Sequence, residues 1–294
     1  MLSPALYFSK FQINYFDYKQ NSLKYLLENY TKMGLDKTIL EYNDKDYETA
    51  IRSDIRQTYF QAIETVFEIF FALLPDSNGK TNDRIIEKIT TSELPYSKIR
   101  EIAQNKSYLD FLDKKIVYSN NITTSLGEFI FYYGLFYTEE ISKEFEESIK
   151  AIKFALHILA NEFSDRKEYN SYKHGLRILP ALQELIICDA DTMQEEYSWS
   201  LKNSMTFYSY DKKTKETSFI TKTFDSERDL RMTSICSNII WNMIKFRDVA
   251  YNRDKKSKDY QFAIPIFGIN EIKDAIKTDV KIQDIKYSLT PDNN

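Results

Sequence analysis

The sequence predicts a mostly α-helical protein, a helical bundle with an inserted β-hairpin. Glycine and proline, the residues that most often end helices, number only six each among 294 residues. Apolar residues recur at three- and four-residue steps through most of the chain, which is the spacing of one helix face. In contrast, the segment 204–224 alternates aromatic and β-branched residues around a charged turn, as a hairpin does.

The expected helices have recognisable boundaries. The strongest apolar stripe lies in 46–74 and ends at Pro75, because proline cannot continue a helix. Thr138 caps the next long helix, 139–163, whose first turns are rich in glutamate, as the helix dipole favours. Asp225 and Ser226 cap the last long helix. The stretch 125–137 fits a helix or a buried strand, of which we favour the helix. In chain order the expected helices are 8–33, 46–74, 82–94, 95–115, 125–137, 139–163 and 227–252.

The chain is expected to form one bundle with a segment at each end. Residues 1–45 are predicted as an N-terminal helical extension, 46–250 as the bundle, and 251–294 as a C-terminal segment with a short strand and a frayed tail. We expect that strand at 260–267, where Pro265 would restrict it to a sheet edge. Strand structure is expected mainly in 204–224 and in this short stretch.

Composition excludes several classes of protein. The most apolar run is too short and too acidic for a membrane span, and no signal peptide is evident, so a cytoplasmic location is expected. The net charge is −4, so any contact with nucleic acid requires a local basic patch. Cys188 and Cys236 are the two cysteines, and with two histidines they cannot complete a zinc site of normal spacing. No metal or cofactor is therefore predicted.

The two histidines lie in different settings. His157 falls on the polar face of its helix, where a solvated side chain is expected. His174 lies in the basic stretch "DRKEYNSYKHGLR", and in a helix it would share a face with Asn170, four residues earlier. Histidine can move a proton near neutral pH, and cations beside it can stabilise a phosphorane-like transition state, as metal-free RNA cleavage requires. On spacing alone, a helix end whose cations complement the dipole is the favoured explanation.

Two other charged sets also have structural and functional interpretations. Ion pairs between packed helices are favoured over acid–base or metal chemistry for the charges that punctuate 46–74. The basic stretch 245–258 closes a helix, where cations suit the dipole, and it is also a candidate contact for phosphates. The charges of the first set are Arg52, Arg56, Glu64 and Glu68.

The order of these features resembles the HEPN-like superfamily over about residues 46–250. The features are the Arg- and Glu-punctuated helix, a later helix closing on "YNSYKHG", the hairpin and another long helix. Members of the superfamily are α-helical bundles, and many are RNases of toxin–antitoxin, anti-phage or CRISPR systems, whereas others are non-catalytic scaffolds or nucleotide binders. Their active motif pairs an arginine with a histidine. Here seven residues separate Arg166 from His174, one more than the motif allows.

The resemblance implies a metal-independent RNase or RNA-binding effector of a bacterial defence or toxin–antitoxin system. It implies His174 as general acid and base, with Asn170, Lys173 and Arg166 positioning and neutralising the scissile phosphate. Such sites commonly form across a dimer interface, so the expected partners are RNA and a second copy or another protein, without a membrane. The open alternative is a non-catalytic helical interaction or scaffold subunit of a multi-protein defence complex. Further phosphate contacts are predicted from Arg177, Lys167, Arg247 and Arg253.

Overall fold

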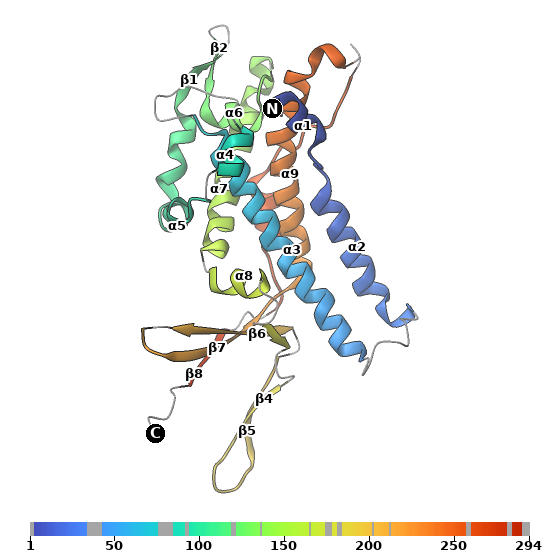
Figure 1. Ribbon diagram of the computed structural model, residues 1–294, viewed down its shortest axis with the longest axis vertical. Coiled ribbons are helices and arrows are strands. Elements are labelled where there is room, and N and C mark those ends of the chain that lie inside the picture. Colours follow the sequence, from blue (N-terminus) through green and yellow to red (C-terminus); the bar gives the residue numbers. More distant parts are fainter. Residues whose placement is uncertain are drawn as a thin grey trace. The chain divides into compact units, whose positions relative to one another are not determined.

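The computed structural model confirms the fold class, because the protein is mostly helical and carries small antiparallel sheets (Figure 1). The contacts between residues divide the chain into two compact units, each assembled from three segments. The structure describes residues 3–33, 43–75, 85–91, 94–118, 122–135, 137–164, 166–173, 178–180, 184–201, 203–211, 213–256, 260–280 and 284–289.

Three long helices contribute residues to both units. They are α2 (Tyr15–Asn29), α3 (Asp44–Leu73) and α9 (Ser226–Tyr251). The first unit comprises Met1–Gln20, Thr58–Ser164 and Arg231–Lys277, and the second comprises Asn21–Gln57, Asp165–Leu230 and Thr278–Asn294.

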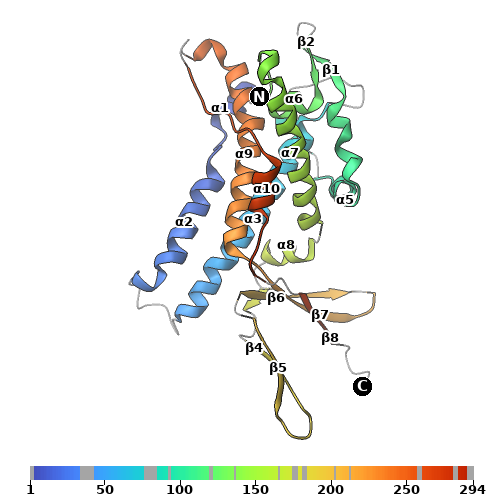
Figure 2. The ribbon, with the colours of Figure 1, turned by 180° about the vertical axis from the view of Figure 1, so that it is seen from behind.

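The first unit is a helical bundle. Helix α10 packs on α7, as the view from behind shows (Figure 2), and α5 packs along α7 as well. A short hairpin of β1 and β2 leads into α6. Besides its parts of α2, α3 and α9, this unit contains α1 (Pro4–Lys10), α4 (Ile85–Thr91), α5 (Tyr96–Gln104), η2 (Lys106–Asp113), β1 (Lys115–Tyr118), β2 (Ile122–Ser125), α6 (Leu126–Phe131), α7 (Glu139–Phe163), η3 (Arg253–Lys255) and α10 (Ile269–Ala275).

Helix α3 supplies the centre of the core in the first unit. The stripe predicted from the sequence is buried, since large side chains recur every three or four residues on one face of a helix. Phe70 stacks on Phe131 with ring centroids 6.1 Å apart, and the helix ends just before Pro75, as predicted. The fully buried members of the stripe in this unit are Tyr59, Ala62, Ile63, Val66, Phe67 and Phe70.

The stretch 125–137 contains a helix, α6, but a short one. Ser125 caps it, and its hydroxyl accepts from the backbone N–H of Glu128 at 3.1 Å. The Glu128 carboxylate accepts in return from the backbone N–H of Ser125 at 2.7 Å, which completes a capping box. The cap therefore fixes where β2 ends and α6 begins.

The prediction of a strand at 260–267 is wrong. Residues 260–268 have no regular secondary structure, because side chains rather than a neighbouring strand take up backbone groups of this segment. Trp241 donates to the carbonyl of Ala263 at 3.2 Å, and Asn242 donates to the carbonyl of Pro265 at 2.8 Å. Pro265 itself has no N–H to offer to a ladder. These bonds hold the segment along α9.

The second unit contains a four-stranded antiparallel sheet in the order β3–β6–β7–β8. The hairpin predicted at 204–224 is confirmed as β6 (Ser204–Asp211) and β7 (Glu216–Thr223), with Phe207 opposite Ile220. Strand β3 (Ile178–Pro180) pairs with β6 and β8 (Asp284–Leu289) pairs with β7, so the hairpin forms the middle of the sheet.

Two further predictions about strands are wrong. The C-terminal tail was expected to fray, yet β8 pairs with β7 through six residue positions from Lys222 to Thr217. Strand structure was expected mainly in 204–224, yet β1–β2 and a separate hairpin of β4 (Glu184–Cys188) and β5 (Glu195–Ser200) also form. Short apolar runs fit either a helix or a strand, and only their distant neighbours decide between the two.

Helices of the second unit make their own small core. Helix α8 (Arg166–Lys173) packs on β6, and Leu23 of α2 packs with Ile51 and Ile55 of α3. The turn η1 (Tyr30–Lys32) follows α2. Partly buried apolar residues surround this core, namely Leu26, Leu27, Tyr30, Tyr47 and Leu230.

Candidate functional site

The basic segment singled out from the sequence begins as helix α8. Asn170 lies on this helix and is half-buried. The helix also includes Arg166, Lys167 and Lys173, of which the backbone is described. The predicted general acid and base, His174, and the predicted phosphate contact Arg177 lie outside the described residues.

Most of α8 around Asn170 is buried. Glu168, Tyr169, Ser171 and Tyr172 are each buried within the second unit. A buried glutamate on a helix this polar needs a compensating charge, because an unpaired carboxylate in a protein interior is very costly. That partner could not be identified from the sequence, since the nearest basic residues in the chain also lie on α8.

Five charged side chains from four elements form one connected set of ion pairs that includes Glu168, and we name them the ionic cluster. The Arg56 Nε atom of α3 donates to Glu168 Oε1 at 2.9 Å, and its Nη1 atom donates to Asp229 Oδ1 of α9 at 2.8 Å. Lys222 of β7 lies 3.3 Å from Glu168 Oε2, and Arg228 lies 3.6 Å from Asp229. The cluster therefore joins α3, α8, β7 and α9.

The ionic cluster is shielded from water. The side chains of Arg56, Glu168 and Asp229 are 13%, 5% and 0% exposed, respectively. Its three cations face two carboxylates, which leaves these five side chains with a net charge of +1. Beside them, burial and then the charge of Glu168 raise the pKa of Tyr172 well above its ordinary value, against the lowering effect of Arg56. Tyr172 therefore keeps its proton near neutral pH.

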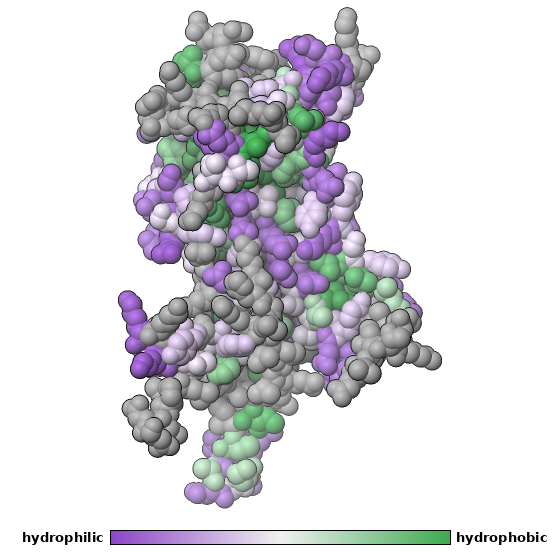
Figure 3. Space-filling model, in the orientation of Figure 1, coloured by the Kyte–Doolittle hydropathy of each residue, from purple (hydrophilic) through white to green (hydrophobic). Residues whose placement is uncertain are grey.

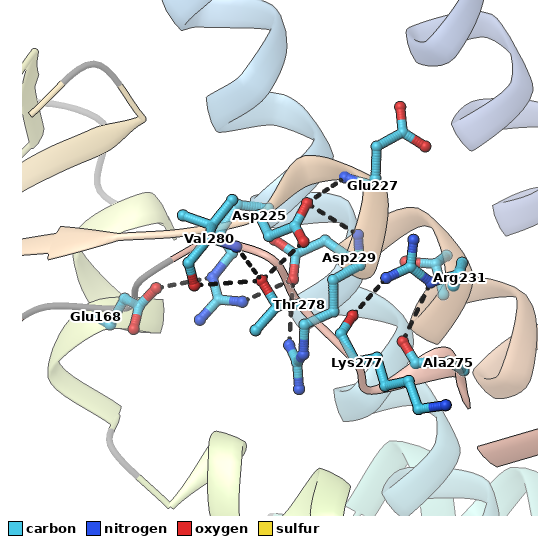
Figure 4. A network of polar contacts seen from close by, with 12 residues as sticks. Glu168, Asp225, Glu227, Asp229, Arg231, Ala275, Lys277, Thr278 and Val280 are labelled. Carbon is cyan, nitrogen blue, oxygen red and sulfur yellow. Dashed lines mark hydrogen bonds and ion pairs between the residues drawn. The ribbon is translucent and has the colours of Figure 1, made fainter. Parts of the chain in front are cut away.

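The start of α9 orients Asp229. Asp225 caps the helix as predicted, since its Oδ1 atom accepts from the backbone N–H groups of Glu227 at 3.0 Å and Arg228 at 3.2 Å. The other oxygen of Asp225 accepts from the Thr278 hydroxyl at 2.9 Å. Figure 4 shows Glu168, Asp225 and Asp229 with these contacts. The cap fixes the first turn, from which Asp229 reaches Arg56.

The charges that punctuate α3 differ in role. Arg56 forms ion pairs with other elements, as predicted, whereas Arg52 pairs with Glu48 of the same helix at 2.8 Å. In the first unit, Glu64 accepts a long hydrogen bond of 3.5 Å from the Tyr96 hydroxyl. Glu68 lines a cavity of about 320 Å³ together with Lys88 and Lys98. The contacts of Arg56 therefore support the ion-pair interpretation.

The two arginines predicted to bind phosphate near the end of α9 differ in exposure. Arg247 is buried and donates to the carbonyls of Phe129 at 2.8 Å and Ile130 at 2.7 Å. Its guanidinium also lies 4.7 Å from the ring centre of Tyr133. This placement does not fit the predicted phosphate contact, because the guanidinium is occupied inside the bundle. Arg253 is exposed on η3.

His157 is not the solvated side chain that its helical position predicted. It is half-buried, and its Nδ1 atom lies 2.8 Å from the carbonyl oxygen of Ile102 on α5. Its Nε2 atom lies 3.2 Å from the amide nitrogen of Asn161. Both contacts are satisfied when Nδ1 carries the proton and Nε2 accepts. His157 thus links α7 to α5, and helix periodicity alone could not identify a partner on another helix.

The chain matches no family model, no curated protein and no solved structure. In the part of the chain that the structure describes, no three His, Cys, Asp or Glu side chains are arranged to hold a metal ion. None of the described helices is long and apolar enough to cross a membrane.

Proposed function

We propose that the chain is a metal-independent RNA-cleaving or RNA-binding effector whose site lies at the C-terminal end of α8. The observation that supports this most strongly is the anchoring of α8 by the ionic cluster. Glu168 ties the helix to Arg56 of α3 and to Lys222 of β7. A site built on a helix whose position is fixed in this way can hold its groups in one geometry, as catalysis requires.

The proposed chemistry needs a proton carrier and cations but no cofactor. The 2′-oxygen of a ribose would form a bond to the adjacent phosphorus, and the bond from phosphorus to the 5′-oxygen would break. His174 would accept the proton from the 2′-hydroxyl, and a proton would return to the leaving 5′-oxygen. Asn170, Lys173 and Arg166 would orient and neutralise the phosphate as its negative charge grows. The products are a 2′,3′-cyclic phosphate and a 5′-hydroxyl.

A second candidate is a non-catalytic interaction subunit, and one observation favours it. Glu168, Tyr169 and Tyr172 are buried and help to hold α8 in place. The burial of Tyr169 and Tyr172 gives both tyrosines of "YNSYKHG" a structural role without any chemistry. The two candidates predict different behaviour for RNA.

The test compares the two histidines of the chain. Wild type, His174→Ala and His157→Ala are incubated with labelled RNA in the presence of a chelator, and each protein is checked for helix content. The proposal predicts cleavage by wild type and by His157→Ala, with cyclic-phosphate ends, and none by His174→Ala. His157→Ala is a matched control because it makes the same chemical change at a histidine with a structural role.

RNA binding is measured separately as a function of salt. For single-stranded RNA, the logarithm of the association constant plotted against the logarithm of the salt concentration should have a slope of about −0.7 for each phosphate contact. Removing Lys167 or Arg177 should each reduce that slope by about 0.7, whereas removing the exposed Lys273 of α10 should leave it unchanged. An absence of both cleavage and salt-dependent RNA binding would exclude the proposal and favour the interaction subunit.

A further inference from the structure

The hairpin of β4 and β5 differs from the other hairpin of the second unit. Strands β6 and β7 are flanked by β3 and β8, and Phe207 is buried. In contrast, β4 and β5 pair only with each other among the described strands (Figure 1). Two strands alone are marginal in water, and both of their outer edges can accept a further strand.

Exposed apolar side chains mark this hairpin. Ile186 is 49% exposed, Met193 75% and Tyr197 46%, and every residue from Ala190 to Ser198 is exposed. The register also places apolar residues opposite one another, Ile187 with Tyr197 and Leu185 with Trp199. The space-filling view shows apolar and polar residues mixed at the end of the picture where this hairpin lies (Figure 3).

The turn of the hairpin is well built. Asp189 Oδ1 accepts from the backbone N–H of Thr192 at 2.7 Å, from its hydroxyl at 2.8 Å, and from the backbone N–H of Asp191 at 3.1 Å. These hydrogen bonds lower the pKa of Asp189. The bond from the Thr192 backbone has the largest effect, followed by the bonds from the Thr192 hydroxyl and the Asp191 backbone, and the carboxylate stays charged. Met193 takes the left-handed conformation, at φ 55°, that closes the turn. The hairpin therefore presents a defined tip.

The charge of this hairpin is of one sign. The sequence from 178 to 201 contains no Lys, Arg or His. Exposed edge strands are usually protected by charged side chains, most often lysine, that prevent unwanted pairing. Here the protecting charges are all negative, so they exclude acidic partners and admit basic ones. The acidic residues of the segment are Glu184, Asp189, Asp191, Glu195 and Glu196.

We propose that the β4–β5 hairpin is a docking arm for a partner protein that adds a basic, extended strand to one of its edges. The open edges supply main-chain hydrogen bonds, the apolar side chains supply contact area, and the carboxylates select lysine and arginine on the added strand. A second copy of this hairpin would bring five carboxylates against five, and the phosphates of a nucleic acid would be repelled in the same way. This surface goes beyond the proposed RNA site and does not depend on it.

The probe is a fluorescent ten-residue peptide of alternating lysine and valine, used with the full-length chain at low salt. A second peptide carries a backbone N-methyl group on every residue, which removes the donors of both edges while the charge stays the same. Fluorescence anisotropy should show binding of the first peptide and at least about tenfold weaker binding of the second. Equal binding of the two peptides would mean attraction by charge alone and would overturn the proposal, as would no binding of either.

Two charge-reversed variants locate the site. The double variant Glu195→Lys/Glu196→Lys should weaken binding of the first peptide at least about tenfold. The control Glu139→Lys/Glu140→Lys changes the net charge equally at exposed residues of α7 and should bind as wild type does. Equal losses in the two variants would overturn the proposal. Sedimentation velocity adds one further check: a dimer that the first variant abolishes would identify a second copy as the occupant and refute a basic partner.

Discussion

Replacing Arg56 by alanine should lower the free energy of unfolding by about 3–5 kcal/mol, the range measured when one partner of a buried ion pair is removed. The substitution withdraws two hydrogen bonds, to Glu168 at 2.9 Å and to Asp229 at 2.8 Å. Asp229 accounts for the larger share of the lost stability, because its side chain is fully buried. The ion pair that it keeps with Arg228 is longer, at 3.6 Å, than the pair that it loses. Glu168 retains Lys222 at 3.3 Å.

Arg52 provides a matched control one helical turn earlier on α3. Its pair with Glu48 has the same 2.8 Å separation, but the two side chains are 24% and 21% exposed. Ion pairs in contact with water contribute at most about 1 kcal/mol. Arg52→Ala makes the same change in helix propensity as Arg56→Ala. The difference between the variants therefore compares the buried ion pairs of Arg56 with the partly exposed contacts of Arg52 to Glu48 and to the Ser226 hydroxyl at 3.3 Å.

The assay is urea unfolding followed by circular dichroism, with the slope of the transition compared between variants. The expected result is a difference of about 2–4 kcal/mol between Arg56→Ala and Arg52→Ala. Combining Arg56→Met with Asp229→Asn should recover part of that loss, because the fully buried carboxylate is then neutral while Glu168 keeps Lys222 as its partner. A difference below about 1 kcal/mol would refute the view that the cluster anchors α8.

Two more predictions concern the first unit. Phe67→Ala should cost about 3–5 kcal/mol in urea unfolding, because the ring is fully buried in the α3 stripe, and a loss below about 1 kcal/mol would contradict that placement. Glu128→Gln keeps the capping box but loses the charge at the start of α6, which should cost about 0.3–1 kcal/mol at neutral pH. Burial alone would raise the pKa of Glu128, but hydrogen bonds from Thr124 and Ser125 and the charge of Lys115 lower it overall. The charge therefore stabilises the fold above the ordinary glutamate pKa of about 4.3, and this stabilisation is lost as the pH falls through the lower folded-state value. Unfolding curves of wild type and Glu128→Gln from neutral to acidic pH should converge, and a gap that widens toward acid would contradict the assignment.

The helices could be predicted because their signals are local. The spacing of apolar residues along α3 and the proline after it lie within one continuous segment, and each residue's contribution to a helix face depends on its neighbours three and four positions away. The same holds for the cap at Asp225 and for the alternation in β6 and β7. The fold class therefore followed from the sequence.

The pairing of strands and the hydrogen-bond partners of individual backbone groups were harder to predict. The stretch 260–267 has the composition of a strand, but Trp241 and Asn242 take its carbonyl groups and no strand forms there. The sequence of 284–289 carries little indication of a strand, yet this segment forms β8 and completes the sheet beside β7. Such outcomes depend on which surface the segment meets after the chain has folded, and the segment itself does not encode that surface.

By itself the sequence determined that this protein is a helical bundle with a hairpin, and it drew attention to the basic segment that contains α8. Tertiary structure alone decided what holds that helix in place. Along the sequence, Arg56 lies 112 residues from Glu168 and 173 residues from Asp229. Contacts between residues so far apart produce no periodic pattern in the sequence from which they could be predicted. The pairing arises because burial in one unit removes water from all three side chains, and a buried charge then requires an opposite charge within hydrogen-bonding distance.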